Sequence, residues 1–284
     1  MFLKIIKNLN RTSSQSEPAI ICRKNKTTAD YRTSSQSEPA IICRKKIYKF
    51  VEFIISLIMP KSCLICNKII LDGYFCSEDF DKLHFISKPN CKICGQPFEF
   101  EVAQNMICAV CIYKKPKFDR AISILKYDEI SKNFILSFKY QDKTQLAGFF
   151  ANLMFIGAKE ILADIDFVTP VALHKNRLRK RKFNHSALIA KNFAKIAKLS
   201  IIYDLLIRQK NTKPQFSLSK LARKRNISGA FIFNIKYLEI IKGKNILIID
   251  DVITTGVTID EYCKVLRKFK IGKIYDLTLA KTTI

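Results

Sequence analysis

The stretch that most constrains the fold spans residues 245–260 and reads NILIIDDVITTGVTID. Four apolar residues run into two adjacent carboxylates, Asp250 and Asp251, and a Thr-Thr-Gly turn follows. A short apolar run that ends in turn residues predicts a buried parallel strand. Thr258 and Glu261 have the spacing of a capping box, which predicts that a helix opens here. The stretch therefore predicts a strand–turn–helix unit of an α/β fold.

The same unit has the features of a phosphate site. Backbone N–H groups at the turn and the helix dipole both favour an anion, and Gly256 allows close approach without a Cβ clash. The hydroxyls of Thr254, Thr255 and Thr258 can donate to phosphate oxygens. The Gly-Lys-Ser/Thr of a Walker loop is missing here. Two carboxylates at a strand end suit the hydroxyls of a ribose, or a magnesium ion beside it. The predicted ligand is a 5-phosphorylated ribose.

This pattern resembles the phosphoribosyl pyrophosphate (PRPP) motif of type I phosphoribosyltransferases, in which a hydrophobic run precedes Asp-Asp-x-x-Thr-Thr-Gly-x-Thr. The resemblance implies that Mg²⁺ and PRPP bind here. The residues that it places around the ligand are Asp250, Asp251, Val252, Ile253, Thr254, Thr255, Gly256, Val257 and Thr258. The alternative is an ordinary strand–helix unit, which would explain the capping box but not two consecutive Asp before Thr-Thr-Gly.

A four-cysteine group lies further toward the N-terminus. Its members are Cys91, Cys94, Cys108 and Cys111, arranged as two Cys-x-x-Cys pairs with 13 residues between them. Each pair places two thiolates on a tight knuckle, and two knuckles supply the tetrahedron that zinc prefers. Because a four-thiolate site is closed, we expect structural zinc that folds a segment without a core of its own.

A second cysteine group, Cys63, Cys66 and Cys76, is one ligand short. Asp79 stands where a fourth cysteine would complete the second knuckle, and a carboxylate oxygen can bind zinc. His84 is the other donor nearby. Three interpretations follow: the site is completed by Asp79, completed by His84, or degenerate. Zinc at this site is thus a weaker expectation than at the four-cysteine group.

The N-terminal part contains a duplicated peptide, RTSSQSEPAIICRK, at residues 11–24 and again at 32–45. Two polar copies cannot stack into a solenoid, so we expect a disordered, dispensable tail and do not count its Cys22 and Cys43 as ligands. The copies resemble peptides encoded by palindromic repeat elements inserted into bacterial genes. The predicted domains are a tail at 1–48, a lead-in and double zinc ribbon at 49–116, and a phosphoribosyltransferase-like domain at 117–284.

Strands alternate with helices in residues 117–284, which predicts a parallel sheet flanked by helices with ligands at the carboxyl ends of its strands. A strand expected at 166–173 ends before His174, Lys175 and Arg177, which we predict to form a pyrophosphate loop. The basic residues that follow, Arg179, Arg181 and Lys182, are nucleic-acid candidates. The alternative is a solvated basic loop in a Lys-rich chain. The polar stretch 208–231 suits a mobile loop that closes over the site.

An ordered series of motifs resembles the ComF competence-protein family over residues 49–284. The series comprises the paired knuckles, Phe138-Lys139-Tyr140, residues 169–184 and 212–215, Arg225-Asn226-Ile227, Gly229-Ala230-Phe231 and the PRPP motif. Three positions depart from the family pattern. Lys182 replaces a glycine, Ala172 replaces the second proline of a paired-proline strand, and Asp79 replaces a knuckle cysteine.

The resemblance implies a protein that supports DNA uptake in natural transformation, acting on incoming single-stranded DNA in the cytoplasm. It also implies transient association with a membrane DNA-uptake complex. A second hypothesis is an active phosphoribosyltransferase that transfers phosphoribosyl from PRPP to a nucleobase or amine, although no base-binding hood or general base is identifiable in the sequence. A third is a decayed gene product, marked by the inserted repeats, Asp79 and Lys182. The sequence does not define the oligomeric state.

The charge of the chain is lopsided, with 50 Lys+Arg against 24 Asp+Glu and a net charge of +26. Such an excess suits nucleic acid, but replacement of Arg by Lys in an AT-rich genome is an equal alternative. We find no convincing signal peptide, and the apolar stretch 50–59 is too short to span a bilayer and contains Glu52. We therefore expect a cytoplasmic protein with reduced cysteines.

Overall fold

The computed structural model describes residues 61–71, 73–140, 143–212 and 219–283. The chain divides into two compact units, the first ending at Phe80 and the second running from Asp81 to Ile284. The predicted tail, with its copies at 11–24 and 32–45, and the lead-in up to residue 60 lie outside the described residues. The predicted boundary between ribbon module and domain at 116/117 stays a prediction.

The described part of the first unit is organised by short backbone contacts. An isolated antiparallel bridge pairs Ser62 with Ile69, and the Cys63 N–H donates to the Lys68 carbonyl at 2.8 Å. The short helix α3 (Ser77–Asp81) begins next to Cys76 and buries Asp79 and Phe80. The knuckle at residues 63–66 and the start of α3 thus lie within one small folded segment.

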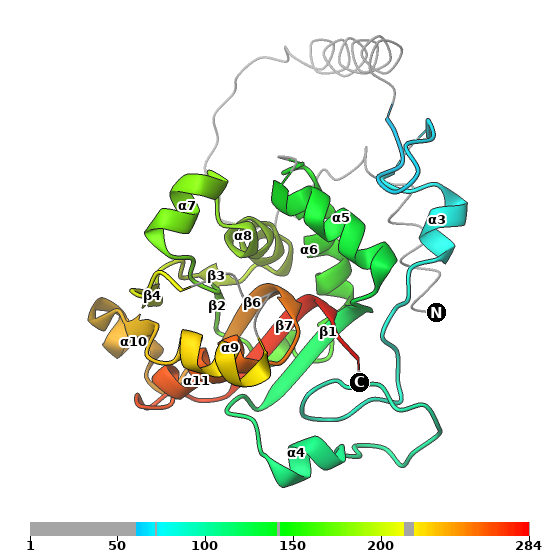
Figure 1. The fold of residues 1–284 in the computed structure, drawn as a ribbon. Coiled ribbons are helices and arrows are strands. Elements are labelled where there is room, and N and C mark those ends of the chain that lie inside the picture. The colour runs from blue at the N-terminus through cyan, green and yellow to red at the C-terminus, as the bar shows by residue number, and fades with distance from the viewer. Residues whose placement is uncertain (1–60, 72, 141–142, 213–218, 284) are drawn as a thin grey trace, which may run out of the picture. The chain divides into compact units, whose positions relative to one another are not determined.

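The second unit is built on a five-stranded sheet in which every strand is parallel to its neighbours, as the sequence predicted (Figure 1). The strand order is β1 (Arg120–Lys126), β7 (Ile274–Lys281), β6 (Ile246–Ile253), β2 (Phe167–Pro170) and β3 (Ser200–Ile201). All eight residues of β7 are buried, as expected for a strand covered on both faces. The C-terminal strand therefore lies inside the sheet.

Helices cover both faces of this sheet (Figure 1). One face carries α5 (Glu129–Tyr140), α6 (Leu146–Gly157) and α8 (His185–Ala197). The other face carries α11 (Val257–Leu266), whose Ile259, Tyr262 and Cys263 are buried against the apolar residues of β6 and β7. The remaining elements are α4 (Ala109–Tyr113), η1 (Leu162–Asp164), α7 (Lys175–Arg181), β4 (Leu206–Arg208), α9 (Lys220–Ile227), β5 (Phe231–Phe233), η2 (Ile235–Tyr237) and α10 (Leu238–Ile241).

The predicted capping box is wrong. Helix α11 begins at Val257, and its N-cap is Gly256, two positions before Thr258, the expected N-cap. The Glu261 carboxylate instead accepts a hydrogen bond of 2.8 Å from the backbone N–H of Gly229, which is distant in sequence. A tertiary contact has therefore replaced the local cap.

Two segments predicted as loops contain regular structure. The basic stretch after β2 forms the helix α7, so the predicted pyrophosphate loop is the start of a helix. The polar stretch 208–231 contains the end of β4, the helix α9 and the start of β5, and β4 pairs with β5 in a separate antiparallel ribbon. Its residues 213–218 lie outside the described ranges.

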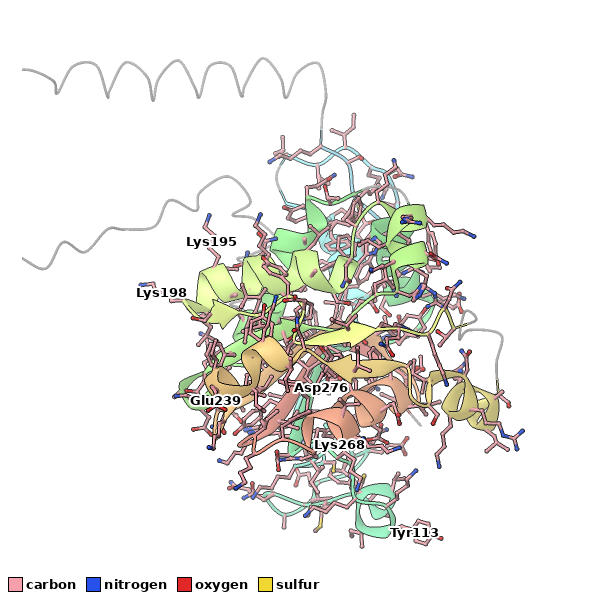
Figure 2. All side chains as sticks on the ribbon, turned by 90° about the vertical axis from the view of Figure 1, so that its left-hand side faces the viewer. Tyr113, Lys195, Lys198, Glu239, Lys268 and Asp276 are labelled. Carbon is pink, nitrogen blue, oxygen red and sulfur yellow. The ribbon has the colours of Figure 1, made fainter. Side chains whose placement is uncertain are left out.

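An ionisable residue, Asp276, lies in the centre of the fold. Asp276 is fully buried in β7, where its register partners are Ala121 in β1 and Ile248 in β6 (Figure 2). Neither of its carboxylate oxygens has a hydrogen-bond partner among the described residues. Burial raises the pKa of Asp276 well above its ordinary value, with repulsion from Asp250 adding to the shift. Burial therefore favours the neutral form of this side chain.

Within the described ranges, no helix combines the length and apolar character needed to cross a bilayer.

Candidate functional site

The residues predicted to form an anion cradle lie in the turn between β6 and α11. Strand β6 continues through the acidic pair to Ile253, and Thr254, Thr255 and Gly256 form the turn. Gly256 has φ +71°, a left-handed conformation that favours glycine, whereas a Cβ there would meet only Ile253 Cδ1 at 3.9 Å. Backbone geometry, not lack of space, thus calls for glycine here. The first N–H groups of the ten-residue helix α11 face this turn.

The two carboxylates of the pair have different partners. Asp250 Oδ1 accepts hydrogen bonds from Ser186 Oγ at 3.0 Å and from the Asp251 backbone N–H at 2.9 Å. Asp251 Oδ2 forms an ion pair of 2.9 Å with Lys139 Nζ from α5, and both side chains are mostly buried. The pair is thus held at the carboxyl edge of the sheet by residues from α5 and α8.

Burial and the neighbouring carboxylate raise the pKa of Asp250 to about 7. Hydrogen bonds from the Asp251 N–H and Ser186, and the charge of Lys139, act in the opposite direction. Two adjacent carboxylates in a partly buried place favour a proton or a metal ion between them. The site is therefore suited to a cation as well as to hydroxyl donors.

The predicted pyrophosphate residues lie at the start of α7. His174 is the N-cap, and its Nδ1 accepts a hydrogen bond of 3.2 Å from the Asn176 backbone N–H. Lys175 is exposed, and Arg177 Nη2 donates to the Thr212 carbonyl at 2.6 Å. His174 thus has a structural role in starting the helix, while Lys175 and Arg177 supply the positive charge.

A buried arginine that sequence reasoning missed lies beside them. Arg208, in β4, donates through Nη2 to Thr212 Oγ1 at 2.5 Å and lies over the Phe231 ring. Burial and repulsion from Arg177 lower its pKa to about 10, and attraction to Asp250 opposes this shift. Thr212 therefore joins the guanidinium groups of Arg177 and Arg208 close to the acidic pair.

The nucleic-acid candidates lie at the end of α7. Arg179 and Lys182 are exposed, whereas Arg181 donates to Tyr140 Oη at 3.1 Å and lies over its ring at 5.3 Å from the centroid. Lys182 ends the helix with φ +63° and ψ −35°. The structure thus places the three cations on one short segment but engages Arg181 with an aromatic ring.

Helix α9 contacts the turn from the side. Arg223 Nη1 donates to Thr254 Oγ1 at 3.1 Å, and Gly229, two residues after the end of α9, donates its N–H to Glu261 of α11. Neither contact is evident from a sequence motif, because both join segments about 30 residues apart. Phe138-Lys139-Tyr140 was the one signal that could have identified Lys139.

Both cysteine groups form compact ligand clusters. The ligand atoms of Cys91, Cys94, Cys108 and Cys111 lie within 4.8 Å of one another, as do those of Cys63, Cys66, Cys76 and Asp79. Cys94 and Cys108 Sγ are 3.7 Å apart, and so are Cys66 and Cys76 Sγ. Tetrahedral zinc with Zn–S of about 2.3 Å separates sulfurs by roughly 3.8 Å, so both donor sets fit zinc. The second set includes Asp79, not His84.

His84 is engaged elsewhere, because its Nδ1 lies 2.7 Å from Asp128 Oδ2. In the four-cysteine cluster, burial raises the pKa of Cys91, but backbone N–H groups of Cys108, Cys94 and Ile93 outweigh it and lower that pKa to about 7. A thiol with a lowered pKa gives up its proton readily, as metal binding requires.

The four-cysteine cluster is attached directly to the sheet. The Ala121 N–H in β1 donates to the Ile93 carbonyl at 2.6 Å, and Lys281 Nζ at the end of β7 donates to the Cys94 carbonyl at 2.6 Å. Gly95 has φ +67°, and a Cβ there would come within 2.8 Å of the Ala121 carbonyl oxygen. This knuckle therefore belongs to the same compact unit as the sheet.

Two family models match the chain. The double zinc ribbon domain matches residues 54–112, and the phosphoribosyl transferase domain matches residues 188–280. Among solved structures, a hypoxanthine phosphoribosyltransferase from Staphylococcus aureus is similar with a TM-score of 0.34 and 16% identity, over 49% of this chain and 64% of that chain.

Several curated relatives are similar to this chain over most of its length. Competence protein F of Haemophilus influenzae is 28% identical over 69% of this chain and 86% of the relative. DNA utilization protein YhgH of Escherichia coli K12 is 25% identical, covering 80% and 99%. Competence protein ComFC of Bacillus subtilis is 25% identical, covering 74% and 85%. A double zinc ribbon followed by a phosphoribosyltransferase domain, together with relatives named Competence protein F, ComFC and YhgH, supports the ComF family.

Proposed function

We propose that this chain binds Mg²⁺-PRPP at the β6–α11 turn and uses this site in handling incoming single-stranded DNA. The observation that carries the PRPP part is the acidic pair placed directly before an anion-binding turn at the carboxyl edge of the sheet. Ligands of open parallel sheets bind at this edge. The site thus combines groups for a phosphate with groups for a ribose.

In this proposal the N–H groups and hydroxyls of residues 254–258 hold the 5-phosphate. Asp250 and Asp251 accept the ribose hydroxyls, and Lys175 and Arg177 lie toward the pyrophosphate. Mg²⁺ bound with PRPP supplies positive charge that offsets the pyrophosphate. Lys139, now paired with Asp251, adds a cation at the same place.

Calorimetric titration with Mg²⁺-PRPP tests this proposal. The double change Asp250→Asn with Asp251→Asn should weaken binding at least about tenfold, because it removes two charged hydrogen-bond acceptors. Glu129→Gln is a matched control, since Glu129 is an exposed carboxylate at the start of α5. Equal affinity in the double variant would contradict the proposal. Absence of binding by the wild-type chain would favour the decayed gene product instead.

The DNA part of the proposal rests on positive charge and on relatives named for competence and DNA utilization. The exposed Arg179 and Lys182, with Arg181 beside Tyr140, supply cations and an aromatic ring, the groups that hold single strands. This proposal includes a cytoplasmic location for the chain and its transient association with a membrane DNA-uptake complex.

A second candidate is an active phosphoribosyltransferase, which the match to the phosphoribosyl transferase domain favours. It predicts that pyrophosphate is released from PRPP when a nucleobase or amine acceptor is supplied. Release is measured across a broad acceptor panel with the wild-type chain and the double Asp variant. Intact PRPP binding without release from any acceptor would count against this candidate.

A further inference from the structure

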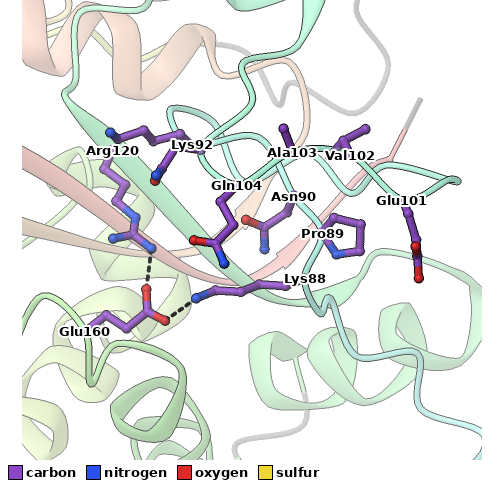
Figure 3. Close-up of a pocket in the computed structure, with 11 residues that line it drawn as sticks. Lys88, Pro89, Asn90, Lys92, Glu101, Val102, Ala103, Gln104, Arg120 and Glu160 are labelled. Atoms are coloured by element: carbon purple, nitrogen blue, oxygen red, sulfur yellow. Dashed lines mark hydrogen bonds and ion pairs between the residues drawn. The ribbon is translucent and has the colours of Figure 1, made fainter.

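A cavity of about 510 Å³ lies between the four-cysteine ribbon and the start of the sheet. Its walls are the ribbon segments 88–92 and 101–105, together with Arg120 and Glu160 (Figure 3). All of these residues belong to the second compact unit. The volume is within the range of small-molecule sites, which is about 300–1,000 Å³.

This cavity is separate from the PRPP site. Arg120 is the first residue of β1, and β1 runs parallel to β7 and β6. The acidic pair lies toward the other end of these strands, at the carboxyl edge. A seven-residue strand is about 20 Å long, so the two sites lie at opposite edges of the sheet.

The cavity contains a ready arrangement for an oxyanion. Glu160 Oε1 lies 2.5 Å from Lys88 Nζ, and Glu160 Oε2 lies 2.8 Å from Arg120 Nη2. Each oxygen of this carboxylate is thus paired with a different cation. Two oxygens of a phosphate can form charge-assisted hydrogen bonds with two such cations in the same way. These cations lower the pKa of Glu160.

A third cation, Lys92, also lines the cavity, and its ammonium group forms no hydrogen bond or ion pair with the residues that the structure describes. The lining therefore contains three cations, Lys88, Lys92 and Arg120, against two carboxylates, Glu101 and Glu160.

Two side-chain amides face the same space. In Figure 3, Asn90 and Gln104 point toward Lys88 and the Glu160–Arg120 pair, whereas Glu101 points away. A side-chain amide offers a donor and an acceptor side by side, which is what the edge of a nucleobase requires. The lining therefore pairs base-type recognition with phosphate-type recognition.

We propose that this cavity binds a nucleotide, with its phosphate at Lys92, Arg120 and Lys88 and its base edge at Asn90 and Gln104. The ligand is either a free nucleotide or the phosphorylated end of a single strand, which share this chemistry. The cavity is independent of PRPP, so the proposal can hold or fail apart from the proposed function.

The zinc cluster holds the walls of the cavity in place. The Lys92 N–H donates to the Met106 carbonyl at 2.9 Å, and Asn90 forms a bridge with Pro97. Both wall segments flank or connect the ligands Cys91, Cys94 and Cys108. Nucleotide binding at the cavity therefore requires the metal-loaded chain.

Titration of the full, zinc-loaded chain with deoxyadenosine monophosphate tests the proposal by calorimetry. We expect saturable binding that is at least about tenfold tighter than that of inorganic phosphate. Lys92→Ala should weaken it about tenfold through loss of a charged hydrogen bond. Glu160→Gln should strengthen it, because both cations become available to the phosphate. Lys195→Ala, an exposed lysine of α8, and the double Asp250→Asn, Asp251→Asn variant should bind as the wild type does.

Each variant is first checked for its zinc content and thermal unfolding, so that a loss of binding reports the site and not the fold. A 5′-phosphorylated oligonucleotide that binds more tightly than both its unphosphorylated form and the mononucleotide identifies a strand end, whereas a mononucleotide that binds at least as tightly as the phosphorylated strand identifies a free nucleotide. The proposal is overturned by absence of saturable binding, by wild-type affinity of Lys92→Ala, by equal affinity for inorganic phosphate, or by loss of binding in the PRPP-site variant.

Discussion

Lys182 has a backbone conformation that normally selects glycine. Its φ of +63° and ψ of −35° end α7, and the related family pattern has a glycine at this position. A side chain with a Cβ in the left-handed region costs about 1–2 kcal/mol. The departure noted in the sequence thus has a physical cost at Lys182.

Lys182→Gly should stabilise the fold by about 0.5–1 kcal/mol, because relief of strain exceeds the added entropy of the unfolded chain. The measurement is chemical unfolding followed by circular dichroism. Lys180→Gly is the control, since Lys180 lies inside the same helix and glycine there should destabilise it by about 1 kcal/mol. Destabilisation by both changes would refute the assignment of strain.

Asp276 predicts a pH dependence of stability. Its pKa is raised in the folded chain, so the folded state binds a proton more tightly than the unfolded state. Stability is then fully present below the unfolded pKa of about 4 and falls as pH rises toward the folded pKa, by at most about 1.4 kcal/mol per pH unit.

Asp276→Asn should remove this part of the slope. The free energy of unfolding is measured from pH 4 to 8 for both chains. The variant's free energy of unfolding relative to that of the wild type should increase with pH. Asp250, whose pKa is also raised, contributes a slope of the same sign in both chains. Because Asp250 also repels Asp276, the difference between the chains reports Asp276 together with this coupling. Parallel curves would show that Asp276 ionises freely in the core.

Residues that touch across the fold were the ones that sequence reasoning missed. Lys139, Arg208 and Arg223 reach the candidate site from α5, β4 and α9. None of them lies in the PRPP motif. Only Lys139 had a sequence signal, Phe138-Lys139-Tyr140, whereas Arg208 and Arg223 resemble any other cation in a Lys-rich chain. Their roles depend on which segments the sheet brings together, which local spacing does not encode.

At the scale of elements, predictability followed the hydrophobic pattern. Strand β6 and helix α11 were predicted because an apolar run and a turn define them. The cysteine spacing predicted the four-cysteine cluster, whereas it left the fourth ligand of the other cluster open between Asp79, His84 and none. Helix α7 was predicted as a loop because its basic sequence has no apolar stripe. The cap of α11 was misassigned because Glu261 binds Gly229 across the fold.

The attachment of the four-cysteine ribbon to β1 and β7 predicts that its metal stabilises the sheet. Cys108→Ser should lower the midpoint of thermal unfolding of the second unit and increase hydrogen exchange at the amides of β1 and β7, because Ile93 and Cys94 anchor these strands. Hydrogen exchange with mass spectrometry resolves the two strands.

Cys76→Ser is the matched control for this prediction. Cys76 belongs to the other ligand cluster, in the first compact unit, so its loss should remove one zinc per chain and leave exchange in β1 and β7 unchanged. Equal protection in wild type and Cys108→Ser would mean that the ribbon folds independently of the sheet.

The whole molecule carries a net charge of +26, and the prediction at this scale concerns salt. Affinity for single-stranded DNA should fall linearly with salt on logarithmic axes, with a slope of about −0.7 per neutralised phosphate. Replacing Arg179, Arg181 and Lys182 by Ala should reduce this slope by about 2 if all three contact phosphates. Fluorescence anisotropy with a labelled oligonucleotide measures it.

A control with equal loss of charge separates a site from bulk attraction. Lys195, Lys268 and Lys270 are exposed, and Figure 2 shows the first two at the surface. Their joint replacement by Ala should leave the slope within about 0.5 of the wild type. Equal effects of the two triple variants would assign DNA binding to overall charge, as expected for a chain whose Lys content reflects genomic drift.

The position of β7 in the sheet determines when the sheet can form during synthesis of the chain. This strand comes after β1, β2, β3 and β6 along the chain, yet it lies between β1 and β6. On the ribosome, β1 therefore emerges long before the neighbour that joins it to the rest of the sheet. The cysteine knuckles can bind zinc before β7 is made, but the sheet closes only after β7 has emerged. A chain cut short by even a dozen residues would leave two strand edges open to aggregation.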